Sequence, residues 1–174
     1  MIPTLLTMAA LLVAPSEPVA DLGEGPIDFR CDSGQMFTKP NRAICRNNVV
    51  VRRGELLVCC HLFEGFANDE GTWERFVCSD DVRARRGSEI MWANKAVFIL
   101  ETSDLILTGR PAVQRGQSIF RGERIVIHTK SDRARIERPR GTMQPADTPI
   151  PAADTLPLKG ALPARCPIQP APKN

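Results

Sequence analysis

Cys59-Cys60-His61 is the group of neighbouring side chains that most resembles a metal site. Adjacent residues of a strand point to opposite faces, so Cys59 and Cys60 cannot readily bind the same ion. The chain has no second Cys-x-x-Cys or His-x-x-x-His motif to supply the remaining ligands of a tetrahedral zinc site. We therefore predict no metal site and no cofactor, and we assign the cysteines to disulfide bonds.

The sequence contains no recognisable catalytic motif either. The two histidines, His61 and His128, lie outside any nucleophile motif such as Gly-x-Ser-x-Gly, and no glycine-rich phosphate loop is present. The paired acids at 69–70 and 80–81 fall in predicted turns, where solvated carboxylates are expected. We predict no catalytic residues and a protein that is not an enzyme. Nucleic-acid binding is not expected, because basic and acidic residues are interleaved, the net charge is only +3 and aromatics are scarce.

The two ends of the chain differ from its middle in composition. A short, mostly apolar stretch at 5–13 precedes Pro15 and Pro18, which predicts a secretory signal over residues 1–20; the alternative is an uncleaved, disordered N-terminus. Residues 142–174 contain eight prolines and few large apolar side chains, which predicts an extended, mobile tail. One folded domain is expected at residues 21–141. Six cysteines agree with export to an oxidising compartment.

The middle region has the pattern of β-strands. Short β-branched or alternating runs occur at 48–52, 95–100, 104–108 and 124–128, with turn signals between them. No stretch keeps a helical apolar period for three turns. The sequence therefore predicts an all-β domain.

An internal repeat runs through this domain. Segments 49–54, 82–87 and 111–116 each end in a basic residue and a turn glycine. Six residues after each glycine comes a small residue followed by a polar one, and Cys31-Asp32 is an earlier copy of this corner. The corners are 29, 33 and 29 residues apart: Cys31-Asp32, Cys60-His61, Ala93-Asn94 and Gly122-Glu123. Small residues fit a tight bend of a sheet, so stacked copies predict a trough or flattened barrel.

Strand alternation assigns one face of the repeat to the interior. These residues either pack on one another and leave no cavity, or line an open trough. The scarcity of aromatics and the small corner residues favour the trough. The predicted apolar lining is Val49, Val51, Leu56, Val58, Phe63, Met91, Phe98, Phe120, Ile125 and Ile127.

The repeat also suggests disulfide pairs. Cys31 and Cys60 share the corner position, and Cys45 and Cys78 each lie nine residues before a turn glycine. If equal positions stack as neighbouring strands, the pairs Cys31–Cys60 and Cys45–Cys78 come within bridging distance. Cys59 and Cys166 would then be free or paired through the tail.

Several segments resemble the organic-solvent-tolerance repeat of the LptA-like (OstA-like) family. The resemblance covers about residues 27–138 and includes Asn-Asn before Val-x-Val, where the family usually has Gly-Asn, then a turn glycine and a small-polar corner. Asn47 stands where the family usually has glycine, and the corners differ from the usual Ala-Asp. The segments are Asn47-Asn48-Val49-x-Val51-x-x-Gly54-x-Leu56-x-Val58-x-Cys60-His61, Leu105-x-Leu107-Thr108-Gly109-x-Pro111-Ala112-Val113 and Phe120-x-Gly122-Glu123-x-Ile125-x-Ile127.

The resemblance implies a twisted β-jelly roll, open at its ends, that holds the acyl chains of lipopolysaccharide in the periplasm. It implies partners in the inner-membrane and outer-membrane transport machinery, reached through edge strands, and a capacity for end-to-end homo-oligomers. Arg53, Arg86 and Arg115 share one repeat position, so we expect a column near a sheet edge that either contacts head-group phosphates or forms a solvated edge. The alternative function is an adaptor with the same fold, a closed core and no lipid, acting by edge-strand pairing.

Overall fold

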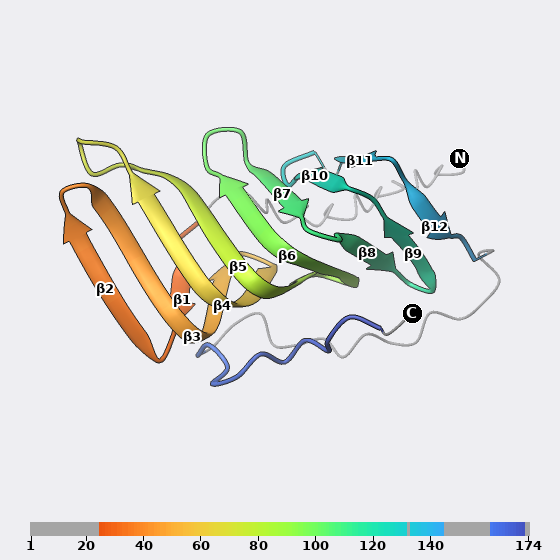
Figure 1. The fold of residues 1–174 in the computed structure, drawn as a ribbon, viewed down its shortest axis with the longest axis horizontal. Helices are drawn as coiled ribbons and strands as arrows, with labels where there is room; N and C mark the ends of the chain where they lie inside the picture. The colour runs from red at the N-terminus through yellow and green to blue at the C-terminus, as the bar shows by residue number, and fades with distance from the viewer. Residues whose placement is uncertain (1–24, 132, 145–160, 173–174) are drawn as a thin grey trace, which may run out of the picture.

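The structure, a computed structural model, describes residues 25–131, 133–144 and 161–172. The expected signal at 1–20 lies outside the described residues. Within them the regular secondary structure is entirely β, and the strands belong to one open sheet (Figure 1). No helix long and apolar enough to cross a membrane occurs in this part of the chain. The predicted all-β jelly-roll class is confirmed.

The strands fall into two groups by length. Strands β3 to β6 have 11 to 14 residues each, whereas the other described strands have six or fewer. In chain order they are β1 (Asp28–Arg30), β2 (Ser33–Thr38), β3 (Asn41–Arg53), β4 (Leu56–Ala67), β5 (Trp73–Arg86), β6 (Glu89–Ile99), β7 (Asp104–Thr108), β8 (Ala112–Arg115), β9 (Ser118–Arg121), β10 (Arg124–His128), β11 (Arg133–Glu137) and β12 (Arg140–Thr142).

The long strands pass through two half-sheets. On the outer side of β3, the first part of the strand pairs with β2 and the last part with β1. On the outer side of β6, the first part pairs with β8 and the last part with β7. All four pairings are antiparallel. The half-sheets are joined by β3 to β6 and diverge beyond them. We call half-sheet A the set β1, β8, β9, β12 with segments 49–53, 56–60, 82–86 and 89–93, and half-sheet B the set β2, β7, β10, β11 with segments 41–46, 62–67, 73–79 and 95–99.

The bends between the half-sheets lie at the corners of the repeat. The pairing of β4 with β5 shifts between Cys59 and Leu62, around the predicted corner Cys60-His61. The strands on either side bend at Asn47-Asn48 and Asp80-Asp81, whose φ angles lie between 47° and 66°. Asparagine and aspartate tolerate this left-handed backbone better than most residues, because their short side chains form local hydrogen bonds.

Each copy of the repeat is a hairpin. Gly54, Gly87 and Gly116 have positive φ and connect β3 to β4, β5 to β6 and β8 to β9. Equal positions of successive copies therefore lie two strands apart rather than on neighbouring strands.

The predicted disulfide pairs Cys31–Cys60 and Cys45–Cys78 are wrong for this reason. Cys45 and Cys78 both lie opposite Phe63, on either side of β4. Two strand spacings separate them by about 10 Å, which a disulfide cannot span. The bonds found are Cys31–Cys45, Cys60–Cys78 and Cys59–Cys166, so Cys59 pairs through the tail and no cysteine is free.

The prediction of a mobile tail is wrong for residues 161–172, which we call the strap. The strap has no regular secondary structure and runs across the outer face of half-sheet A (Figure 1, dark blue). Besides its disulfide, it buries Ile168 against Val50 and Leu57. A proline-rich segment has little apolar surface with which to form a core, but a covalent bond and a ready apolar surface order it here.

Candidate functional site

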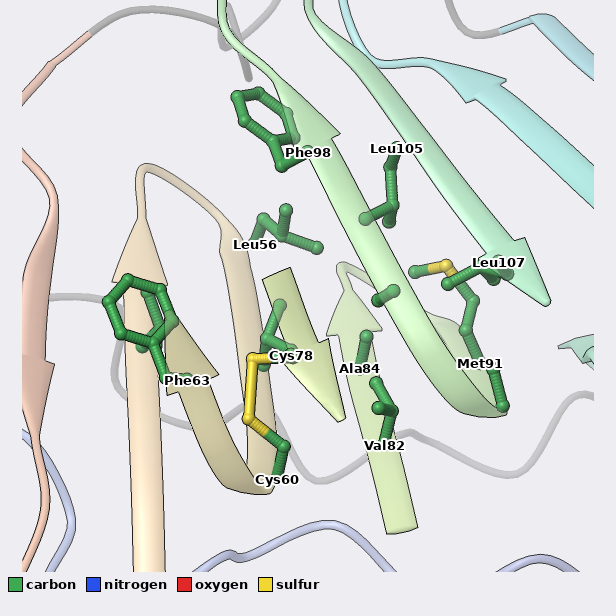
Figure 2. Close-up of a cluster of buried hydrophobic side chains, with 14 of the residues drawn as sticks. Leu56, Cys60, Phe63, Cys78, Val82, Ala84, Met91, Phe98, Leu105 and Leu107 are labelled. Atoms are coloured by element: carbon green, nitrogen blue, oxygen red, sulfur yellow. A yellow bond between two sulfur atoms is a disulfide. The ribbon is translucent and has the colours of Figure 1, made fainter. Parts of the chain in front are cut away.

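The inner faces of the two half-sheets share one apolar cluster (Figure 2). It includes Met91 and Val82 from half-sheet A and Phe98 and Leu105 from half-sheet B, all less than a tenth exposed. Strand alternation explains it, because every second residue of each strand faces inward. The cluster consists of Cys45, Val49, Val51, Leu56, Val58, Cys60, Phe63, Cys78, Val82, Ala84, Met91, Ala93, Ala96, Phe98, Leu105, Leu107, Val113, Ile125 and Ile127.

The structure brings together nine of the ten residues that the sequence assigned to the lining: Val49, Val51, Leu56, Val58, Phe63, Met91, Phe98, Ile125 and Ile127. The tenth, Phe120, lies opposite Val113 in β9, half-buried and outside the cluster. Leu105 and Leu107 were missed, although they alternate within a predicted strand and the same parity rule would have included them.

An aromatic row extends the lining toward β1. The ring of Phe63 stacks on Phe29 at 6.0 Å and on Phe76 at 5.5 Å between centroids. Phe29 belongs to half-sheet A and Phe63 to half-sheet B, so this row joins the two inner faces. No repeat position marks Phe29 or Phe76, and their contribution follows only from the tertiary arrangement.

Small cavities adjoin the apolar cluster between the half-sheets. A cavity of about 50 Å³ is lined by Val51, Arg53 and Leu56 on one side and by Phe63 and Phe98 on the other. A second cavity, of about 150 Å³, lies near β1 and β2 and is lined by Phe29, Cys45 and Phe63 among others. These two spaces are small and have different walls, apart from Phe63, which lines both.

Arg53 lies beside this cavity. Its guanidinium carbon lies 5.1 Å from the centroid of the Phe98 ring, which belongs to the opposite half-sheet. Such a cation–π contact contributes about 0.5–2 kcal/mol, depending on desolvation. The contact closes one side of the cavity with a charge that an incoming group could displace.

Arg53, Arg86 and Arg115 lie in one cross-strand row next to the turns of half-sheet A. The register runs from Arg53 through Leu56, Arg86 and Glu89 to Arg115. Leu56 belongs to the apolar cluster, so the row faces inward at the rim of the half-sheet.

Glu89 separates this row into two electrostatic environments. Its carboxylate accepts a hydrogen bond from Arg86 Nη2 at 2.8 Å and one from Arg115 Nε at 2.6 Å. Both Arg86 and Glu89 are less than a tenth exposed. The shared carboxylate offsets the charge of these two arginines, whereas Arg53 faces the Phe98 ring.

Comparison with known proteins agrees with this architecture. A family model described as "LptA/(LptD N-terminal domain) LPS transport protein" matches residues 30–133, which is more than half of the chain. Among solved structures, LptH of Pseudomonas aeruginosa, described as the LptA homologous periplasmic component of the lipopolysaccharide transport device, superimposes with a TM-score of 0.64. The match covers 72% of this chain and 99% of LptH; at 17% identity it concerns the fold alone. No curated protein sequence matches. The chain belongs to the family of LptA and LptD N-terminal domain lipopolysaccharide-transport proteins.

Proposed function

We propose that this protein carries lipopolysaccharide across the periplasm and holds the acyl chains between its two half-sheets. The observation that carries the proposal is the single apolar cluster that lines both inner faces of an open sheet. Each acyl methylene buried there would contribute about 0.8 kcal/mol, so a few ordered chains suffice for firm binding. Family membership and the periplasmic location of LptH support the same function.

Loading requires the half-sheets to move apart, because a cavity of about 50 Å³ holds no acyl chain. The corners joining the half-sheets are the natural hinges. Separation breaks the contact of Arg53 with Phe98 and exposes the apolar lining to lipid. Arg53, Arg86 and Arg115 lie at the rim of this opening, in the inward-facing row of half-sheet A. We therefore assign head-group contact to these three arginines, whose planar guanidinium groups match phosphate oxygens.

The partners we propose are the inner-membrane and outer-membrane components of the transport machinery, or a second copy of this chain. All six residues of β2 are exposed, and β11 is the last strand on the sheet's main path at the opposite end. An unpaired edge accepts a further strand by backbone hydrogen bonding. Edge pairing would align one roll with the next and continue the apolar path.

Site-specific photocrosslinking tests the location of the lipid. A photoreactive phenylalanine analogue at position 98 faces the interior, whereas one at the neighbouring position 97 faces outward on the same strand. In a Gram-negative periplasm we expect a crosslink to lipopolysaccharide from position 98 and none from 97. Equal crosslinking from both positions, or none from position 98 in a folded protein, would contradict an interior lipid site.

The small volume of the interior cavities favours one other candidate, the non-catalytic adaptor that pairs edge strands without binding lipid. Mass spectrometry of protein purified from the periplasm distinguishes the two functions. Co-purifying lipid A, lost in Val58→Glu but kept in Lys95→Glu on the outer face, supports the carrier. Folded protein that is free of lipid and takes up no added lipopolysaccharide supports the adaptor.

A further inference from the structure

The outer face of half-sheet A carries a second cross-strand row, which the strap follows. The row consists of Val50, Cys59, Arg83, Trp92, Ala112, Arg121 and Arg140. The strap is bonded to Cys59, and its carbonyls accept hydrogen bonds from Arg83 Nη1 at 3.1 Å and Trp92 Nε1 at 2.9 Å. Beyond Trp92 the row continues to two arginines.

A groove of about 590 Å³ opens at this place, between strap residues Ala171 and Pro172 and strands β8, β9 and β12. Trp92, Ala112 and Ile119 contribute its apolar part. Its volume lies in the range of small-molecule sites. The groove opens on the outer face of half-sheet A, and two residues of its wall, Val82 and Ala93, also belong to the apolar cluster between the half-sheets.

The groove is positively charged. Arg110, Arg121 and Arg140 line it, and Asp81 is the only acidic residue among the described residues of its wall. The charge of Asp81 is already offset, because its carboxylate accepts a hydrogen bond from Arg83 Nε at 3.2 Å. Neither Arg110 nor Arg140 forms an ion pair with any residue in the described ranges.

The strand register places two of these charges directly against each other. Arg121 in β9 and Arg140 in β12 are cross-strand partners, so their side chains leave the same face of the sheet side by side. Arg110 lies at a corner with φ of 58° and adds a third guanidinium. An anion bound at the guanidinium groups of Arg110 and Arg140 would offset positive charge that no described carboxylate balances.

We propose that this groove is a phosphate site, which accepts a phosphate group either free or carried on a lipid head group. Arginine matches this ligand, because its planar fork donates two parallel hydrogen bonds to phosphate oxygens. The apolar wall formed by Trp92 and Ile119 provides contact for the non-phosphate part of a larger ligand. Arg121 and Arg140 extend from the outer face of half-sheet A, whereas the proposed lipid lies between the half-sheets.

The indole N–H of Trp92 is a reporter for this site. In ¹H–¹⁵N spectra of the isotope-labelled full chain, titration with inorganic phosphate at constant ionic strength should shift the Trp92 indole signal saturably. The indole of Trp73, on half-sheet B, should not move. Arg121→Gln/Arg140→Gln should weaken phosphate binding about tenfold or more, since each lost charge-assisted hydrogen bond is worth about a factor of ten.

Arg133→Gln/Arg135→Gln is the matched control. It removes the same charge from exposed arginines of β11, which do not line the groove. We expect its phosphate affinity to stay within about twofold of the original. An equal loss of phosphate affinity in both double variants would overturn the proposal. Thermal unfolding gives a second measurement of binding. Phosphate should raise the Tm of the original protein and leave the Tm of Arg121→Gln/Arg140→Gln unchanged.

Vesicles distinguish the two sources of phosphate. We would measure co-sedimentation with phosphatidylcholine vesicles that contain phosphatidylglycerol. Binding that is lost in Arg121→Gln/Arg140→Gln but kept in the control assigns the groove to a lipid head group. A saturable response to inorganic phosphate without vesicle binding assigns it to free phosphate or a soluble phosphate ester. Absence of both responses overturns the site.

Discussion

Strands β3 to β6 pass through their corners without a break, whereas from β7 onward the same repeat is divided at its corners into separate short strands. The continuous region bends at Asn47-Asn48 in β3, Cys60-His61 in β4, Asp80-Asp81 in β5 and Ala93-Asn94 in β6. The interrupted region has Gly109-Arg110 before Pro111, and Arg138 before Pro139. Proline cannot donate a ladder hydrogen bond, so a strand that meets it ends or starts there.

The disulfides follow the same division. Each of the three bonds includes a cysteine of β3, β4 or β5, and none includes a residue of β7 to β12. Both regions contribute to the one apolar cluster. The comparison indicates that the same repeat can form either continuous strands linked by disulfides, which we call the braced region (β3 to β6), or short separate strands, which we call the articulated region (β7 to β12). A few corner residues decide which of the two forms.

Loss of the strap disulfide should have the largest effect on the braced region. Cys59→Ala/Cys166→Ala opens a link between residues 107 apart, which by chain entropy stabilises the fold by about 4–5 kcal/mol. Cys31→Ala/Cys45→Ala, with a separation of 14, should cost about 3 kcal/mol. Guanidinium unfolding followed by tryptophan fluorescence measures both. An equal cost for the two pairs would mean that the strap bond does not constrain the unfolded chain as its length predicts.

Shortening a buried side chain of β7 tests whether the articulated region unfolds together with the braced region. Leu107 is fully buried, so Leu107→Ala should cost about 3 kcal/mol. Ile106→Ala, on the outer face of the same strand, should cost about 1 kcal/mol. If β7 to β12 belong to the same cooperative unit, the transition monitored at Trp92 in β6 shifts with Leu107→Ala. An unshifted Trp92 transition would show that the articulated region unfolds separately.

The sequence predicted the local part of this comparison and missed the long-range part. Alternation in Leu56 and Val58 was sufficient to assign the inner face, and Cys60-His61 was sufficient to place a corner, because both signals lie within a few residues. The disulfide pairs depend on which strands are neighbours. Because each copy of the repeat is a hairpin, equal positions of successive copies lie two strands apart and cannot be bridged. No local pattern connects Cys166 with Cys59 across 107 residues, so the sequence left their pairing through the tail as one of two alternatives and did not predict the path of the strap.

The state of the interior was also beyond the sequence. The lining residues could be listed from their parity, but the packing of Phe63 and Phe98 across the two half-sheets is set by the angle between them. That angle depends on the bend at every corner together. The pattern could therefore identify most of the apolar face and not the volume left inside it.

Glycines at the corners should matter more than glycines at the turns. Gly109 has φ of 73°, and a Cβ there would lie 2.6 Å from Asn94 Cβ, so Gly109→Ala combines backbone strain with a clash. We expect a cost of about 2 kcal/mol. Gly87 has φ of 54° with open space around it, so Gly87→Ala should cost about 1 kcal/mol. Thermal unfolding measures the difference, and the reverse order would mean that the corner at Gly109 is compliant.

The smallest effect should come from Asn47, which stands at a corner with a left-handed backbone conformation. Its φ of 62° is a conformation that glycine adopts freely, but Asn47→Gly also increases the entropy of the unfolded chain. These effects oppose each other, so the net change should stay within about 0.5 kcal/mol. The Asn47 carbonyl accepts a hydrogen bond from Asp32 N at 3.0 Å, and either residue supplies that carbonyl.

Asn47→Ala separates backbone conformation from side-chain chemistry at the same corner. Alanine keeps the carbonyl but pays the left-handed strain without local side-chain hydrogen bonding, so it should cost about 1 kcal/mol. If Asn47→Gly is neutral and Asn47→Ala is not, the continuous corner requires only a permitted positive φ. If both substitutions destabilise the fold equally in urea unfolding, the asparagine side chain itself maintains the bend, and the two regions would differ in side-chain chemistry as well as in backbone.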